Sequence, residues 1–193
     1  MPRGPGMTEL WYVLLPSPFG PFAILWRETE RQPYVLRVFL STGSQSSEQR
    51  LRAAIPDAQP HTDSAITELG HQMQAFLEGQ PIQFALHAVA LENCSEFQQR
   101  VLVAEHGIPR GRVSTYGLIA AHLGVEKGAR AVGTALARNP FPLIIPCHRA
   151  IRSNGELGGY QGGLDMKRRL LQLEGVEVSE AGLVVRPRLH YAT

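Results

Sequence analysis

Cysteine is scarce in this sequence, which has only Cys94 and Cys147 among its 193 residues. Two cysteines do not make the disulfide framework that stabilises small secreted proteins. We therefore expect free thiols in a reducing compartment, of which the cytoplasm is the simplest. One of the two nevertheless lies in the segment NPFPLIIPCHRAI (139–151), directly before a histidine and an arginine.

Long apolar runs are also absent. No stretch reaches the roughly 18 apolar residues of a transmembrane helix, so no membrane span is expected. The segment MPRGPGMTELW (1–11) contains Arg3 but no apolar stretch behind it, which argues against a secretory signal. The hydrophobic share of 44% is that of a globular chain. A chain of this length forms one or two domains with a sizeable core.

The formal net charge of +2 hides an asymmetry along the chain. Residues 97–175 contain eleven Lys or Arg and five Asp or Glu, whereas the remainder contains eight and twelve. A basic half joined to an acidic half suggests that the basic half binds an anionic partner. The alternative is a solvated basic surface without a partner, and charge alone leaves both open.

The N-terminal part, residues 1–92, has the pattern of a small β-sheet domain. Three segments are rich in β-branched or aromatic residues and are bounded by turn formers, which is typical of strands: 10–16, 21–26 and 34–40. We also predict a loop at 41–47, a helix at 64–78 and a further strand at 82–91. Its histidines are scattered, so this part is interpreted as scaffold.

From Ser95 onward the pattern changes to short helices. Two of them, GLIAAHLG and GARAVGTALARNP, are joined by the tight turn LGVEKG and resemble a helix-turn-helix. The segment 176–185 is predicted to be a hairpin and could form a wing. We therefore predict an α+β protein, with a small sheet domain at 1–92 and a helix-turn-helix or winged-helix DNA-binding domain at 93–193.

The helix predicted at 129–138 has an unusual outer face. Val132 and Leu136 fall on the core side of a helical wheel, whereas Arg130, Thr134 and Arg138 lie opposite, among Ala and Gly residues. Small side chains allow close approach to another body, and arginines can neutralise phosphates or enter the base stack. This face favours DNA binding. The alternative is a helix that packs against another helix.

Cys147 has the neighbours of a candidate nucleophile. A cysteine attacks as thiolate, and a nearby base or cation lowers its pKa from about 8.5. His148 and Arg149 are adjacent in sequence, and Glu174 is an acid that could orient the histidine. A buried structural cysteine is the alternative. The glycine-rich loop 153–164 could bring Tyr160 onto a planar ligand, or could be an ordinary surface loop.

Five motifs occur together in one order: GRVSTYGLIAAHLG, ARAVGTALARNP, IIPCHRAI, GELGGYQGGL and KRRLLQLEG. In this order and spacing they resemble the O6-alkylguanine-DNA alkyltransferases, also called methylated-DNA–protein-cysteine methyltransferases. The resemblance covers roughly residues 95–175. The N-terminal half is similar chiefly through SPFGPFAILW, and the family would give it a ribonuclease H-like sheet.

The resemblance implies direct reversal of DNA damage. An O6-alkylguanine would flip out of duplex DNA, and its alkyl group would pass irreversibly to Cys147. His148 would take the thiol proton through a water, and Glu174 would orient His148. Arg130 would fill the gap left by the flipped base. Tyr116 would donate to guanine N3 and help to rotate the 3′ phosphate.

Further roles are implied for three sets of residues. The catalytic set is Cys147, His148, Glu174, Tyr116 and Asn139, the last linking the recognition helix to the cysteine loop. The substrate-binding set is Pro142, Ala150, Tyr160 and Gln161. The DNA-binding set is Ala129, Arg130, Ala131, Gly133, Thr134, Ala135, Arg138, Arg149 and Tyr116. We expect no cofactor and no metal, a monomer, and a cytoplasmic, nucleoid-associated or nuclear location.

The chain departs from the family pattern at three places. Ala150 replaces the usual valine, Leu102 a frequent tryptophan, and Gln161 a small residue. Two other functions stay open from the sequence. One is a lesion sensor or winged-helix regulator in which Cys147 does not react, and the other is a cysteine-dependent hydrolase that turns over.

Overall fold

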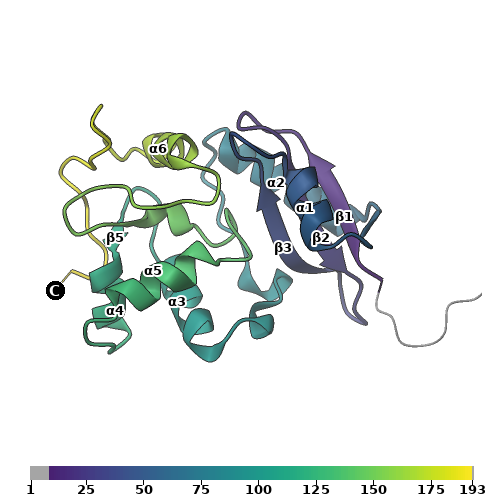
Figure 1. Cartoon of the computed structure of the whole chain (residues 1–193), viewed down its shortest axis with the longest axis horizontal. Helices are drawn as coiled ribbons and strands as arrows, with labels where there is room; N and C mark the ends of the chain where they lie inside the picture. Colours follow the sequence, from purple (N-terminus) through teal and green to yellow (C-terminus); the bar gives the residue numbers. More distant parts are fainter. Residues whose placement is uncertain (1–8, 193) are drawn as a thin grey trace, which may run out of the picture.

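The computed structural model of the protein describes residues 9–192. The segment 1–8, on which the expected absence of a secretory signal mainly rests, lies outside this range. The fold is α+β, as predicted (Figure 1). None of the described helices is long and apolar enough to cross a membrane. In chain order, with η for a 3-10 helix, the elements are β1 (Trp11–Leu15), β2 (Phe22–Arg27), β3 (Tyr34–Leu40), α1 (Ser47–Ala54), β4 (Gln59–Pro60), α2 (Ser64–Leu77), η1 (Leu86–Ala88), η2 (Leu91–Asn93), α3 (Glu96–His106), β5 (Ser114–Thr115), α4 (Tyr116–His122), α5 (Ala129–Ala137), η3 (Cys147–Arg149), β6 (Ala150–Ile151) and α6 (Leu164–Leu173).

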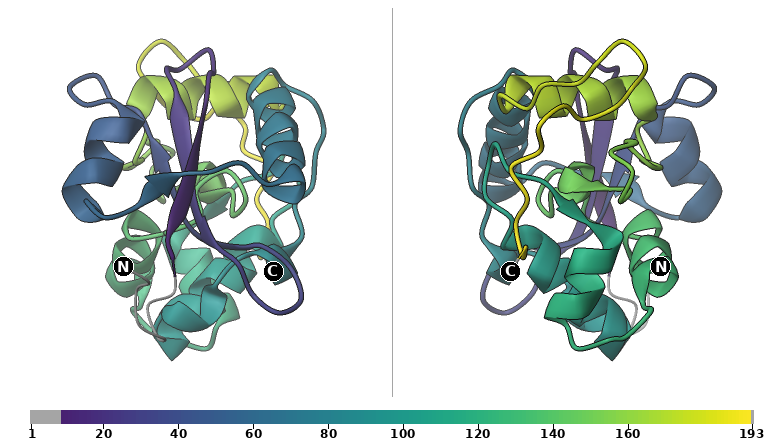
Figure 2. Two further views of the ribbon diagram at one scale, coloured as in Figure 1. Left: turned by 90° about the vertical axis from the view of Figure 1, so that its right-hand side faces the viewer. Right: turned by 90° about the vertical axis from the view of Figure 1, so that its left-hand side faces the viewer.

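The N-terminal half forms a four-stranded sheet in the order β3-β2-β1-β4. The three predicted strands pair antiparallel, and β4 adds parallel to β1. Alternate side chains of a strand point to opposite faces. Ile24 and Trp26 therefore enter the main core, whereas Ala23 and Leu25 pack beneath α1. Helices α1 and α2 lie on opposite sides of the sheet (Figure 2), which explains why β2 is buried on both faces.

Two expectations for this half are wrong. The predicted loop 41–47 ends one residue early, because Ser47 already begins α1 and Ser46 caps it with a capping box to Gln49. The predicted strand 82–91 forms the turns η1 and η2 and pairs with the sheet only at Val89. A full strand would have to pair along the outer edge of β3. The C-terminal half already occupies part of that edge, because the Val38 amide donates to the Pro140 carbonyl at 2.8 Å.

The C-terminal half consists of short helices, as expected. Helices α4 and α5 flank the turn 123–128 and pack on each other and on α3, which gives the predicted helix-turn-helix. The short strands β5 and β6 pair in parallel and bring the residues after Cys147 next to the start of α4. The predicted hairpin 176–185 is a tight antiparallel turn in which the Ser179 amide donates to the Leu183 carbonyl at 2.8 Å.

The two halves share their largest hydrophobic core. Ile24 and Val38 of the sheet lie in one buried cluster with Leu102 of α3 and with Ile145, two residues before Cys147. Leu102, one of the departures from the family pattern, thus lies in the core. The division into domains 1–92 and 93–193 stays a prediction, and the packing makes the sheet a support for the cysteine loop.

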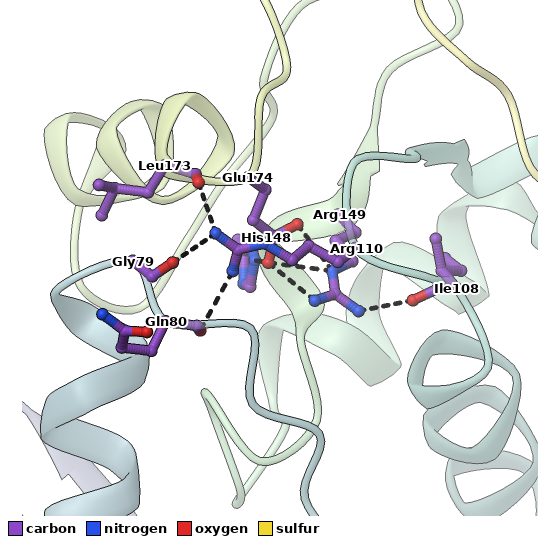
Figure 3. A network of polar contacts seen from close by, with 8 residues as sticks. All are labelled: Gly79, Gln80, Ile108, Arg110, His148, Arg149, Leu173 and Glu174. Carbon is purple, nitrogen blue, oxygen red and sulfur yellow. Dashed lines mark hydrogen bonds and ion pairs between the residues drawn. The ribbon is translucent and has the colours of Figure 1, made fainter.

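Arg110 ties the halves together through backbone carbonyls. Its guanidinium donates to the carbonyls of Gly79 (2.6 Å) and Gln80 (3.3 Å), just after α2, and to that of Leu173 (2.5 Å) at the end of α6. Figure 3 shows this arginine between the two chain segments. Hydrogen bonds to a charged donor stabilise more than neutral ones, and carbonyls left without a partner cost more again.

We predict that Arg110→Met lowers the free energy of unfolding by about 2–4 kcal/mol, because three carbonyls lose their donor. Urea denaturation at pH 7 measures the change. Arg112→Met is the matched control, since Arg112 is exposed and its side chain makes no hydrogen bond within residues 9–192. Its effect should stay within about 0.5 kcal/mol. Equal losses in the two variants would contradict the bridging role.

Candidate active site

Cys147 lies at the start of η3, after a buried loop that begins at Asn139. The Asn139 side chain shapes this loop: its oxygen accepts from the Phe141 amide at 2.9 Å, and its nitrogen donates to the Ile145 carbonyl at 3.1 Å. Asn139 directly follows α5 and its C-cap, so it connects the helix to the cysteine loop. The backbone turns at η3, and Cys147 and His148 are therefore not on opposite faces of a strand.

A buried charge network lies beside the cysteine. Glu174, directly after α6, accepts from Nε2 of His148 at 2.9 Å and from Nε and one terminal nitrogen of Arg149 at 2.9 and 2.7 Å. The other terminal nitrogen of Arg149 donates to the Ile108 carbonyl at 2.6 Å. Figure 3 shows the carboxylate between the imidazole and the guanidinium. All three side chains are buried.

The network fixes the protonation of the histidine. Burial alone raises the pKa of Glu174, but the hydrogen bonds and charges of His148 and Arg149 outweigh it and lower this pKa to about 2. Burial lowers the pKa of His148 and outweighs the opposing effect of Glu174. His148 is therefore neutral at pH 7. Because an ionised carboxylate only accepts, Nε2 carries the proton, and Nδ1 is a free base without a partner among the described residues.

The thiol itself is protonated at rest. Burial raises the pKa of Cys147 to about 11; the Asn139 side chain and Lys167 act against this shift, whereas Glu105 adds to it. The sequence led us to expect a lowered thiol pKa, because a base and a cation are adjacent to Cys147, and this expectation is wrong. A proton acceptor is needed at the moment of reaction, and His148 is the buried base closest in sequence.

Cys147 opens onto a cavity of about 230 Å³. The cavity joins three predicted elements: the start of α4, the recognition helix α5 and the glycine-rich loop. The hydroxyl of Tyr160 is buried there without a hydrogen-bond partner in residues 9–192, and burial raises its pKa well above its ordinary value, so it stays a donor. The lining residues are Tyr116, Gly133, Leu136, Ala137, Cys147, Gly159, Tyr160 and Gln161.

Tyr116 begins α4 and forms one wall of this cavity. Its ring lies against Gly158, where an added Cβ would come within 2.5 Å of the phenol oxygen. Gly158 also has a φ of +69°, so glycine suits the position on both grounds. Burial, followed by Glu105 and Cys147, raises the pKa of Tyr116 to about 12. The hydroxyl therefore remains a hydrogen-bond donor at neutral pH.

The other predicted substrate residues lie less directly at the cavity. Gln161 lines it, and its side-chain amide donates to the Asn139 carbonyl, which ties the loop to the end of α5. Pro142 and Ala150 are buried outside the cavity lining. The Ala150 carbonyl accepts from Nζ of Lys167 at 2.6 Å.

The outer face of α5 largely has the predicted surface. Arg130, Ala131, Thr134 and Arg138 are exposed, and Ala129 and Gly133 are half-buried, the latter at the cavity. Two predicted DNA contacts need correction. Ala135 is buried, because it lies on the side of α5 that packs against α3, where Gln98 donates to its carbonyl. Arg149 is buried and bound to Glu174, so it orients the network instead of meeting phosphates.

Two buried charged residues were missed from the sequence. Glu105 and Lys167 are both fully buried near Cys147. The sequence contained a signal, because each residue occupies a helical position where an apolar residue is expected. Glu105 lies four positions after Val101 and three after Leu102, and Lys167 lies three positions before Leu170 and four before Leu171.

A metal site is not formed in residues 9–192 by any group of three or more His, Cys, Asp or Glu side chains.

We predict that Glu174→Gln lowers the free energy of unfolding by about 3–5 kcal/mol at pH 7, because buried Arg149 loses its counter-charge. The depressed pKa of Glu174 adds stability that is fully present above its unfolded value of about 4.3 and is lost as pH falls towards about 2. The variant should lack this acid-side slope. Urea denaturation between pH 2 and pH 7 measures both effects.

Glu156→Gln is the matched control, because Glu156 pairs with Arg152 at an exposed site. Its loss should be at most about 1 kcal/mol. A Glu174 variant that retains both the stability and the acid slope of the wild type would contradict the network described above.

Comparison with known proteins identifies relatives over most of the chain. The family model described as 6-O-methylguanine DNA methyltransferase, DNA binding domain, matches residues 96–176. The methylated-DNA–protein-cysteine methyltransferase of Methanosarcina acetivorans is 37% identical over 166 residues, which cover 86% of this chain and 99% of the relative. That of Methanothermobacter thermautotrophicus is 47% identical over 114 residues, 59% of this chain and 64% of the relative.

Solved structures show the same likeness. The crystal structure of the Mycobacterium tuberculosis O6-methylguanine methyltransferase has a TM-score of 0.68 at 31% identity, covering 86% of this chain and 92% of that one. The Mycobacterium tuberculosis OGT in complex with DNA has a TM-score of 0.65 at 31% identity, with coverage of 86% and 93%. The chain belongs to the family of methylated-DNA–protein-cysteine methyltransferases.

Proposed function

We propose that the protein repairs duplex DNA by moving the alkyl group of O6-alkylguanine, chiefly O6-methylguanine, onto Sγ of Cys147. The observation that carries the proposal is the cavity that Cys147 shares with Tyr116 and Tyr160. The next residue in the chain is the neutral His148, whose Nε2 donates to Glu174. The family shown by the comparisons acts by this type of transfer, as the names of the relatives state.

The reaction is a displacement at carbon. The thiol proton passes to Nδ1 of His148, directly or through a water, and the Glu174 carboxylate stabilises the imidazolium that forms. The Sγ–carbon bond forms as the bond between carbon and guanine O6 breaks. The electron pair leaves with guanine, and the Tyr116 hydroxyl stabilises this anion by donating to N3. The product is a thioether, which has no route back to the thiol, so each molecule acts once.

Access to the lesion requires extrusion of the base, because O6 lies inside the duplex. The exposed face of α5 supplies the contact surface, since small side chains let the helix enter a groove. Gly133 belongs to both this helix and the cavity lining, so the groove contact lies next to the pocket. Arg130, exposed in the first turn of α5, occupies the space of the flipped base.

The remaining features of the proposal follow from the substrate. The protein acts on duplex DNA as a monomer, without a cofactor, in the compartment that holds the DNA: the cytoplasm with its nucleoid, or a nucleus. The sheet domain has no predicted chemistry and supports the cysteine loop. A lesion sensor and a cysteine hydrolase are outcomes that the following experiment distinguishes.

We predict that incubation with duplex DNA containing O6-methylguanine adds the mass of one methyl group to the protein, at most one per molecule. Intact-mass spectrometry followed by peptide mapping measures the gain and its position. Cys147→Ser should bind the DNA without gaining mass, and Cys94→Ser is the control that should react like the wild type. DNA binding without transfer by the wild type would mark a sensor. Turnover of an acyl substrate without dependence on DNA would mark a hydrolase.

We predict that Arg130→Ala slows transfer from duplex DNA far more than transfer from free O6-methylguanine, because only the duplex leaves a gap to fill. Single-turnover rates with the two substrates give the ratio. Arg138→Ala is the comparison variant, since this exposed arginine on the same face should affect affinity and salt dependence but not the limiting rate. Equal losses with both substrates for Arg130→Ala would exclude the gap-filling role.

A further inference from the structure

Lys167 is a fully buried lysine that connects the two backbone segments around the reacting cysteine. Its Nζ donates to the Ala150 carbonyl at 2.6 Å and to the Gly159 carbonyl at 3.3 Å. Ala150 directly follows η3, which contains Cys147, and Gly159 lines the cavity from the glycine-rich loop. One ammonium group therefore holds the cysteine segment and the substrate loop in a fixed relation.

Glu105 is the second buried charged group outside the histidine network. It lies in the last turn of α3, which packs against η3, and it is fully buried. The Ala150 amide faces its carboxyl group, but neither oxygen reaches a donor at hydrogen-bonding distance within the described chain. Burial raises the pKa of Glu105 to about 8, against the opposing charges of Lys167 and Arg149.

Lys167 is charged at pH 7 although no counter-ion in the described chain touches it. Burial lowers its pKa to about 8, and Cys147 and then Glu105 act against this shift. The ammonium uses two of its three donors on the carbonyls of Ala150 and Gly159. Glu105 is a neighbouring acid, but no ion pair within residues 9–192 joins it to Lys167.

We propose that Lys167 is a positioning residue for alkyl transfer. The ammonium holds the carbonyls of Ala150 and Gly159, so that the cavity keeps its shape around Cys147, and it supplies positive charge to the thiolate that forms during transfer. The titratable groups that act on Lys167 are Cys147 and Glu105.

This inference rests on the proposed function and places a requirement on it. A residue that shapes the pocket should affect the transfer step and not the binding of DNA, because Lys167 is far from solvent. It should affect free base and duplex substrates alike, in contrast to Arg130.

The test is single-turnover transfer by Lys167→Met and Lys167→Arg from duplex and free-base substrates. The work is done at pH 7, below the pKa of Lys167, where the ammonium is populated. Lys167→Met should lower the limiting rate with both substrates roughly 10- to 100-fold, the worth of a lost charged hydrogen bond. Affinity for undamaged duplex should stay within about twofold of wild type.

Amplitude and rate separate positioning from folding. A purely structural role lowers the reactive fraction and the melting temperature but leaves the rate constant of the folded molecules unchanged, and that outcome would overturn the proposal. Lys167→Arg keeps the charge and should recover part of the rate. If Lys167→Met does not fold, Lys167→Arg still decides: a lowered melting temperature with an unchanged rate constant would overturn the proposal.

Alkylation of Cys147 by iodoacetamide keeps the two proposals distinguishable. This reaction needs the thiolate but no DNA and no methyl transfer, and Lys167→Met should slow it at pH 7 while Lys167→Arg should not. A wild type that reacts with iodoacetamide, with the expected dependence on Lys167, but takes no methyl group from DNA would refute the proposed function alone. Transfer by the wild type without any dependence on Lys167 would refute the positioning role alone.

Discussion

One buried carboxylate, that of Glu174, organises the charged groups of the candidate site. Glu174 is ionised because a guanidinium and an imidazole N–H are fixed against it, and neither partner could stay buried in its present state without it. The ionised carboxylate selects the histidine tautomer, and the tautomer leaves Nδ1 as a base. The fold brings this acid, from the end of α6, to His148 and Arg149 of η3, which lie 26 and 25 positions earlier in the chain.

This arrangement explains how the thiol of Cys147 can be buried and still be able to react. A buried thiol with a raised pKa is a poor nucleophile in the resting protein and does not react readily with stray electrophiles. It becomes reactive when its proton can be removed beside a bound substrate. The cavity walls contribute weak acids, Tyr116 and Tyr160, which remain donors because burial raises their pKa values. The site thus combines one base with two donors, which suits a displacement in which a proton is removed on one side and an anion leaves on the other.

Much of this could be predicted from the sequence, and the reasons are local. The strands of the sheet, the helix at 64–78 and the helix-turn-helix follow from period and turn residues, and the family follows from five motifs in order. From the residues alone Glu174 was a candidate by type only, and its expected role came from the family resemblance. Arg149 was misassigned because an arginine next to a nucleophile is equally compatible with a phosphate contact and with a buried ion pair; only the fold decides. The strand at 82–91 failed because pairing depends on a free edge, which a linear pattern does not reveal.

The bond between the Val38 amide and the Pro140 carbonyl has a consequence for how the chain can vary. This hydrogen bond joins the edge strand β3 to the C-terminal half at Pro140, directly after Asn139, which organises the cysteine loop. Side chains of the amino-terminal half can therefore drift widely over evolution, as long as a strand margin and an apolar surface remain. The half itself cannot be cut away, because its removal would leave the Pro140 carbonyl without its donor and would expose the apolar core that the two halves share.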